Sequence, residues 1–88
     1  MRDFWEKHPD SEQPLKAWFY ETKKAKWKNP AEVRKLFGSA DFVGDRTVFN
    51  IGGNKYRLVV LIDYERHGIL IRFIGTHKQY DKIDVNLI

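Results

Sequence analysis

The segment from residue 75 to residue 82 holds the densest set of reactive side chains in the chain. His77, Tyr80 and Asp81 carry an imidazole, a phenol and a carboxylate, and two lysines accompany them. In a helix, spacings of three and four residues would place these three groups on one side. RNA cleavage by the 2′-hydroxyl needs a base, an acid and cations on the phosphorane, and these groups can serve if a phenol or ammonium base has a shifted pKa. The alternative, commoner for a single sequence, is a tail in which His77 and Tyr80 only cap a sheet.

Two arginines, Arg57 and Arg72, lie inside apolar stretches that are typical of neighbouring antiparallel strands. Burying a guanidinium is costly unless an anion pairs with it. On one concave face the two groups could clamp a phosphate and stabilise the charge that develops during its transfer. Each could instead pair with a carboxylate such as Asp63 or Glu65 and serve structure alone. The sequence leaves these two interpretations close to even.

A metal or cofactor site is not expected. The histidines at 8, 67 and 77 are scattered, without the paired spacings that zinc sites use, and the chain has no cysteine. Gly52-Gly53 is too short for a phosphate-binding loop and reads as part of a hairpin turn. We therefore predict chemistry without a metal and without a small-molecule cofactor.

Two helices are predicted in the first half of the chain. Asp10 and Ser11 are candidate caps for a helix from Pro14 to about Lys26. Its apolar stripe falls at i, i+3, i+4 and i+7, on Leu15, Trp18, Phe19 and Thr22. Asn29-Pro30 begins a second helix, and Gly38 is a plausible stop.

Strands are predicted from residue 46 onward. They run over Arg46–Ile51, Lys55–Tyr64 and Ile69–Ile74, and Gly52-Gly53-Asn54 forms the first turn. Simple alternation puts Ile69, Ile71 and Phe73 on one face of the last strand. One helical turn is expected around Lys78–Lys82. The prediction is an α+β fold in which two N-terminal helices pack on one face of an antiparallel sheet of about three strands, followed by a short C-terminal helical segment.

Composition indicates one small basic domain over residues 1–88. The net charge is +4, and 42% hydrophobic residues with 15% aromatic ones can form a core. No membrane-length apolar run and no signal peptide are visible, so a cytoplasmic protein is the default. Positive charge favours polyanions such as nucleic acid. The lysines and arginine of the helical half make it the basic half of the chain: Lys16, Lys23, Lys24, Lys26, Lys28, Arg34 and Lys35.

The tryptophans offer a second route to RNA. Trp5, Trp18 and Trp27 could stack on bases. Core packing is the stronger interpretation for Trp18, because it lies on the apolar stripe. Trp27 stands between two lysines, and we expect it to act as a lid or a partner contact.

Four segments resemble the HigB toxin family, which belongs to the RelE-like toxins of bacterial toxin–antitoxin pairs. They are Asp3-Phe4-Trp5-Glu6-Lys7-His8-Pro9, Ala40-Asp41-Phe42-Val43, Val48-Phe49-Asn50-Ile51-Gly52-Gly53-Asn54-Lys55-Tyr56-Arg57-Leu58 and Arg72-Phe73-Ile74-Gly75-Thr76-His77-Lys78-Gln79-Tyr80-Asp81-Lys82-Ile83-Asp84. The resemblance covers nearly the whole chain. The motifs Asn-x-Gly-Gly-Asn-x-Tyr-Arg and Gly-Thr-His-x-x-Tyr-Asp are its most specific parts.

The resemblance implies a ribosome-dependent mRNA endonuclease that cuts the A-site codon through 2′-hydroxyl attack, without a metal. It also implies a HigA-type antitoxin as partner, besides the ribosome and mRNA. The implied catalytic and phosphate-binding residues are Arg57, Arg72, His77, Tyr80, Asp81 and Lys82. Arg57 and Arg72 would hold the phosphate, His77 or Tyr80 would move protons, and Asp81 would orient a neighbour. Lys55 and the basic helices would contact RNA.

The sequence departs from the family pattern at the start of the chain. Family members usually begin with a short β-strand and several further residues before the Phe-Trp segment, whereas this sequence opens at Met1-Arg2-Asp3-Phe4. Loss of such a strand would expose a sheet edge. Two alternatives follow, a non-catalytic truncated module that binds antitoxin or RNA only, and a protein of the same fold that poisons gyrase. His77 and Tyr80 together favour nuclease chemistry over the gyrase alternative.

Overall fold

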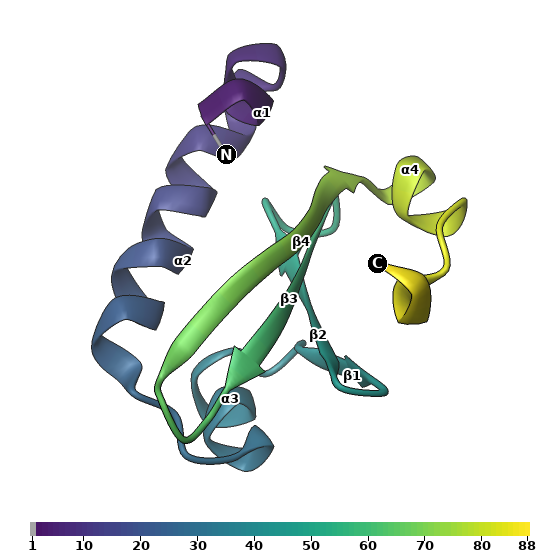
Figure 1. Ribbon diagram of the computed structural model, residues 1–88. Helices are drawn as coiled ribbons and strands as arrows, with labels where there is room; N and C mark the ends of the chain where they lie inside the picture. The colour runs from purple at the N-terminus through teal and green to yellow at the C-terminus, as the bar shows by residue number, and fades with distance from the viewer. Residues whose placement is uncertain (1) are drawn as a thin grey trace.

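Helices fill the first half of the chain and strands most of the second (Figure 1). The periodicities predict the second and third of the α-helices and the main strands, but the short first helix at residues 2–7 was not predicted. The computed structural model describes residues 2–88. In chain order the elements are α1 (Arg2–Lys7), the 3-10 turn η1 (Pro9–Ser11), α2 (Glu12–Ala25), α3 (Pro30–Leu36), β1 (Asp41–Val43), β2 (Arg46–Ile51), β3 (Tyr56–Asp63), β4 (Gly68–Thr76), α4 (His77–Asp81) and η2 (Val85–Leu87). The predicted α+β class is confirmed.

The sheet has four antiparallel strands in the order β1-β2-β3-β4, one more than the sequence indicated. The additional strand, β1, has three residues, which is too short to show alternation in the sequence. β3 lies inside the sheet, as its apolar composition predicts. The turn at Gly52 and Gly53 is also confirmed, because both residues adopt positive φ values of 64° and 71°. β4 occupies one edge of the sheet.

The predicted faces of the last strand are wrong beyond Ile71. Val59 pairs with Phe73 and Val60 pairs with Ile71, so Arg72 is an extra residue in a β-bulge. A bulge shifts the side-chain alternation by one residue. Phe73 therefore packs on the opposite face of the sheet from Ile71.

One face of the sheet packs against the N-terminal helices and carries the larger core. Leu15 and Trp18 of α2 meet Phe49 and Leu58 there. Trp27 is 5% exposed and stacks near Phe49, so the prediction of a lid or partner contact for Trp27 is wrong. Trp27 lies in the short segment that connects α2 to α3, and this segment places its side chain in the core.

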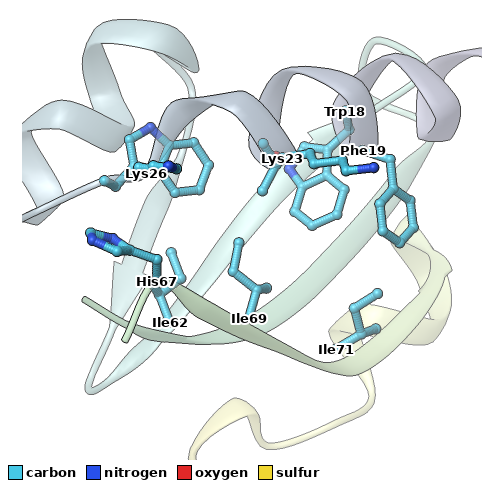
Figure 2. Close-up of a pocket in the computed structure, with 10 residues that line it drawn as sticks. Trp18, Phe19, Lys23, Lys26, Ile62, His67, Ile69 and Ile71 are labelled. Carbon is cyan, nitrogen blue, oxygen red and sulfur yellow. The ribbon is translucent and has the colours of Figure 1, made fainter. Parts of the chain in front are cut away.

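Phe19 differs from the rest of the predicted stripe. Leu15, Trp18 and Thr22 are buried, but Phe19 is 48% exposed. Phe19 instead borders an apolar groove of about 470 Å³ between α2 and β4, where it lies at the same end as Ile71 (Figure 2).

The opposite face carries a smaller core of Val48, Val59 and Val85, covered by α4 and η2 (Figure 1). Tyr80 of α4 packs against this cluster. The C-terminal segment is therefore part of the fold and not only a solvated tail. It forms a wall on the face of the sheet away from α2.

The helix starts differ in their chemistry. Helix α3 begins at Pro30, as predicted, and Asn29 caps it, since its side-chain oxygen accepts from the backbone N–H of Glu32 at 3.0 Å. Ser11 precedes α2, but its hydroxyl donates to the carbonyl of His8 at 2.7 Å and makes no side-chain cap. Asp10, the other predicted cap, does not cap α2 either. Its carboxylate instead accepts hydrogen bonds from the Tyr56 hydroxyl and from Lys55 of the β2–β3 hairpin. Among residues 2–88, no helix combines the length and the apolar character needed to cross a membrane.

Candidate active site

A polar cavity of about 470 Å³ opens on the sheet face that carries the C-terminal segment. Strands β2 and β3, helix α3 and helix α4 each contribute to it. Its side chains comprise two guanidinium groups, one carboxylate, one amide and one phenol, from Arg34, Arg57, Asp41, Asn50 and Tyr80. The backbone at residues 38–40 and the side chain of Val48 complete the wall.

Arg57 is half-buried and lies on β3, where its cross-strand partner is Asn50. Its guanidinium donates to the backbone carbonyl of Asn54 at 3.2 Å, to the Asn54 side-chain oxygen at 3.1 Å and to the carbonyl of Tyr56 at 3.3 Å. Within residues 2–88, no carboxylate forms an ion pair with Arg57, so its full charge is available to an anion in the cavity. The neutral acceptors fix the fork in place without cancelling that charge.

Tyr80 reaches the cavity because helix α4 begins at a fixed point. Thr76 and Gln79 form a capping box, in which the Thr76 side chain accepts from the Gln79 N–H at 3.1 Å and the Gln79 side chain accepts from the Thr76 N–H at 2.9 Å. Burial, and then the negative charge of Asp41, raise the pKa of the Tyr80 phenol, and the positive charge of Arg57 opposes this shift. Tyr80 is therefore a neutral hydrogen-bond donor near pH 7.

His77, Asp81 and Lys82 lie on the exposed side of the same short helix. His77 Nδ1 is 3.0 Å from Asp81 Oδ2, which is the i, i+4 contact predicted from the spacing. Tyr80, however, does not share that side, because it turns inward to the sheet. His77 and Asp81 are therefore exposed at the surface and do not line the cavity, although both lie within three residues of Tyr80 in the sequence.

Arg57 and Arg72 lie on neighbouring antiparallel strands, as predicted, but Arg72 is not directly opposite Arg57. Arg57 pairs with Gly75, while Arg72 is the exposed extra residue of the bulge and does not line the cavity. The second guanidinium of the cavity is Arg34 of α3. Its Nε donates to the carbonyl of Ala40 at 3.3 Å, and its charge lies 5.2 Å from the centre of the Phe42 ring.

Sequence reasoning missed Asn50 and Asp41 and gave Arg34 only a general contact with RNA. A signal for Asn50 was present, because the short turn at residues 52–55 sets a register that pairs Asn50 with Arg57. No comparable signal identified Asp41 or Arg34. Their approach to the cavity depends on how α3 packs, which is a tertiary feature.

The basic residues that the sequence analysis expected to contact RNA do not gather at one site. Lys16 pairs with Glu12 at 2.6 Å and Lys55 pairs with Asp10 at 2.9 Å, both at the surface. Lys24 lies over the Tyr20 ring at 4.2 Å. The other lysines of this set are exposed: Lys23, Lys26, Lys28 and Lys35. Within residues 2–88, no cluster of three His, Asp or Glu side chains is arranged to hold a metal ion.

The architecture and the comparisons with known proteins define a class, the RelE-like toxins. Residues 11–83 match the HigB toxin family, described as a RelE-like toxic component of a toxin–antitoxin system. The chain is 33% identical over 84 residues to the mRNA interferase toxin HigB of Escherichia coli strain K12, covering 92% of this chain and 81% of that protein. The mRNA interferase HigB of Shigella flexneri gives the same values. A further mRNA interferase HigB, from Escherichia coli O6:H1, is 26% identical over 80 residues, covering 88% of this chain and 78% of that protein.

The chain belongs to the HigB toxin family. The resemblance that was based on the Gly-Gly-Asn-x-Tyr-Arg and Gly-Thr-His motifs is therefore confirmed. Membership in a toxin–antitoxin family implies an antitoxin as partner.

Proposed function

We propose that this protein is an mRNA interferase, an endoribonuclease that cuts the A-site codon of mRNA on the ribosome and so inhibits translation. The observation that carries the proposal is the polar cavity, in which Arg34, Arg57 and the neutral phenol of Tyr80 meet. Two guanidinium groups and a proton donor are what a phosphorane with a departing alkoxide requires. The relatives are mRNA interferases, which supports the same reaction.

In the proposed mechanism the 2′-hydroxyl oxygen attacks the adjacent phosphorus, and the bond from phosphorus to the 5′-oxygen of the next nucleotide breaks. The products are a 2′,3′-cyclic phosphate and a 5′-hydroxyl. Arg57 and Arg34 stabilise the charge on the phosphorane, and Tyr80 donates a proton or a hydrogen bond to the leaving 5′-oxygen. The reaction needs no metal and no cofactor.

His77 is the proposed base. With Nδ1 held by Asp81 at 3.0 Å, Nε2 is free to accept the proton of the 2′-hydroxyl. Asp81 is then a positioning residue that selects the tautomer. Because the 2′-oxygen and the phosphorus that it attacks are neighbouring atoms of one linkage, the proposal requires the scissile phosphate to lie at the edge of the cavity nearest α4, within reach of both Tyr80 and His77. The exposed cations Arg72 and Lys82 are proposed to contact the flanking phosphates.

The proposed partners are a HigA-type antitoxin, the ribosome and mRNA, and the proposed location is therefore the cytoplasm. The basic set of α2, α3 and Lys55 is proposed to contact ribosomal RNA. These contacts would act mainly through charge, since most of the set is exposed and none of its members is held in a base-reading geometry.

The decisive experiment is primer extension on an mRNA in a purified translation system, with this chain added and ribosomes present or omitted. Cuts that appear only with ribosomes, in frame with the A-site codon, are the expected result. Cuts without ribosomes would remove the ribosome from the proposal. No cuts from a folded protein that still binds antitoxin would favour the alternative, a non-catalytic module that binds antitoxin or RNA only.

A further inference from the structure

The turn between β2 and β3 supports one of the guanidinium groups of the polar cavity. We call residues 52–56 the hairpin tip. The fork of Arg57 donates to the carbonyl and side-chain oxygens of Asn54 at 3.2 and 3.1 Å, and to the carbonyl of Tyr56 at 3.3 Å. All three acceptors belong to the hairpin tip. The direction in which Arg57 points therefore depends on where the backbone of the tip lies.

The hairpin tip also fixes the start of helix α4. The backbone N–H of His77 donates to the carbonyl of Lys55 at 3.0 Å. The first N–H groups of a helix have no partner within the helix, so this bond ties the first residue of α4 to the tip. In the proposed reaction His77 is the base and Arg57 binds the phosphate. Both residues thus take their positions from one short turn.

The hairpin tip is weakly held by its own backbone. Gly52 and Gly53 adopt positive φ, and glycine loses more conformational freedom on ordering than any other residue. The backbone bond that closes the tip, from the Lys55 N–H to the carbonyl of Gly52, is long at 3.5 Å. The side chains of Asn54 and Lys55 are exposed. A contact from another part of the chain is needed to fix this turn.

Asp10 supplies that contact from the helical layer. It lies in η1, just before α2, and is 46 residues from Tyr56 in the sequence. One oxygen of its carboxylate accepts from the Tyr56 hydroxyl, and the other accepts from the Lys55 ammonium at 2.9 Å. The hydrogen bonds from Tyr56 and from Lys55 lower the pKa of Asp10, so its carboxylate is charged near pH 7. One charged group therefore binds two successive residues of the tip.

We propose that Asp10 is a positioning residue for RNA cleavage. By holding Lys55 and Tyr56, it fixes the hairpin tip, and the tip in turn directs Arg57 at the phosphate and holds His77 at the start of α4. Asp10 does not line the polar cavity, so it acts through the tip and not on the reacting atoms. The proposal rests on the proposed nuclease function, because cleavage is the reaction that this geometry serves.

The alternative is an ion pair that serves folding alone. The side chains of Lys55 and Asp10 are 67% and 49% exposed, and exposed pairs of this kind add little to stability. The Tyr56 contact differs, because Tyr56 is 6% exposed and its ring belongs to the larger core. A contact that serves folding alone would change the melting temperature and leave the rate of the folded protein unchanged. A positioning contact changes the rate of a protein that is fully folded.

The first test compares Asp10→Ala with Glu12→Ala in single-turnover cleavage on ribosomes, at a temperature where both are folded. Asp10→Ala should lower the rate at saturation by about 10–100-fold, because small displacements of reacting groups are costly. It should change the half-saturating ribosome concentration by less than about threefold. Glu12 is the matched control, since it also forms a surface ion pair, with Lys16 at 2.6 Å. Glu12→Ala should keep the saturated rate within about twofold. A wild-type rate from folded Asp10→Ala would overturn the proposal.

Tyr56→Phe tests whether Asp10 acts through the tip. This variant keeps the ring in the core and removes the hydroxyl that Asp10 binds. The double variant Asp10→Ala with Tyr56→Phe should cleave within about twofold of the slower single variant, because both changes break the same contact. Effects that multiply would mean that the two residues act separately, and they would overturn the proposal.

Hydrogen exchange at the His77 amide supplies a measurement that does not depend on cleavage. Exchange should become faster by about tenfold or more in Asp10→Ala, and should not change in Glu12→Ala, because the His77 N–H is bonded to the tip. Unchanged exchange at His77 in Asp10→Ala, in a protein whose wild type cleaves mRNA, would refute the positioning role alone. A folded wild type that does not cleave would refute the nuclease function on which the proposal rests.

Discussion

At the scale of single residues, Tyr80 shows how the fold decides between roles that the sequence left open. A phenol could act as base or acid, but burial and the charge of Asp41 raise the Tyr80 pKa above its usual value. The phenol therefore keeps its proton near neutral pH. This assigns Tyr80 to proton donation in the proposed mechanism and leaves His77 as the base.

Tyr80→Phe should lower single-turnover mRNA cleavage on ribosomes by about 10²–10⁴-fold, the range for loss of a general acid. The wild-type rate should not rise with phenolate formation below about pH 10, the ordinary tyrosine value. Stability should fall above that pH, because the folded state holds the proton while the unfolded state has released it. An ultraviolet titration of phenolate, followed with thermal melting, checks both points.

Tyr20→Phe is the control for the Tyr80 variant. Tyr20 is an exposed tyrosine of α2 and does not line the polar cavity. It should cleave like the wild type. A Tyr80→Phe protein that melts and cleaves normally would remove the phenol from the mechanism.

Variants of Arg34 and Arg72 distinguish the site predicted from the sequence from the site that the structure shows. Arg34→Ala should reduce cleavage at saturating ribosomes by about 10²–10³-fold, since it removes a donor from the developing charge. Arg72→Ala should mainly raise the ribosome concentration needed for half-maximal rate, because Arg72 is exposed outside the cavity. The reverse pattern would favour the Arg57–Arg72 clamp. Arg66→Ala, at an exposed turn, is a control that should change neither value.

At the scale of elements, the sequence predicts those helices and strands that are determined by hydrophobic periodicity and by turn residues. Helices α2 and α3 follow their apolar stripes and proline starts, and the β2–β3 hairpin follows from its glycines. The bulge at Arg72 was not predictable, because it arises from the fit of β4 to β3 and α2 and not from a local signal. With this bulge Arg57 pairs with Gly75 and Arg72 is unpaired, so the clamp interpretation of the two arginines depended on a register that the sequence does not reveal.

The glycine before the Thr-His motif has a packing role that belongs to the junction of β4 and α4. A Cβ added at Gly75 would lie 2.6 Å from Cζ of Phe73 and 2.7 Å from Oε1 of Gln79. Gln79 is the side chain that closes the capping box, and Phe73 packs in the core under α4. A methyl group at residue 75 would thus disturb both the start of α4 and its support.

Gly75→Ala should lower the free energy of unfolding by about 1–3 kcal/mol, the usual range for overpacking. It should also reduce cleavage at temperatures where the protein is folded, because Tyr80 depends on the start of α4. Gly68→Ala at the other end of β4 is the matched control, since its Cβ would meet only Asp63 Cβ, at 4.0 Å. Chemical denaturation of the two proteins measures the difference. Equal stability would mean that Phe73 and Gln79 yield at little cost.

At the scale of the whole molecule, the sheet separates two surfaces of different character. Helix α4 lies on one face of the sheet and α2 on the other (Figure 1). The polar cavity opens on the face of α4, and the apolar groove lies beside α2. The sequence showed the basic excess of the helical half but could not show that α2 lies across the sheet from the reactive segment. Only Arg34 of that basic set reaches the cavity. In the proposed mechanism we therefore expect the remaining cations to affect binding and not the reacting phosphate.

This separation predicts how charge changes on the helices alter the kinetics. Lys24 and Lys28 are exposed, and neither lines the cavity or the groove. The double variant Lys24→Gln with Lys28→Gln should raise the ribosome concentration for half-maximal cleavage and make binding less sensitive to salt, by about one unit of log–log slope for each lysine that contacts a phosphate. The rate at saturation should stay within about twofold, because the reacting phosphate lies across the sheet from α2. Sedimentation with ribosomes over a salt series, followed by single-turnover cleavage at saturation, separates the two effects. A fall in the saturated rate without a change in the salt slope would mean that these lysines reach the reacting strand.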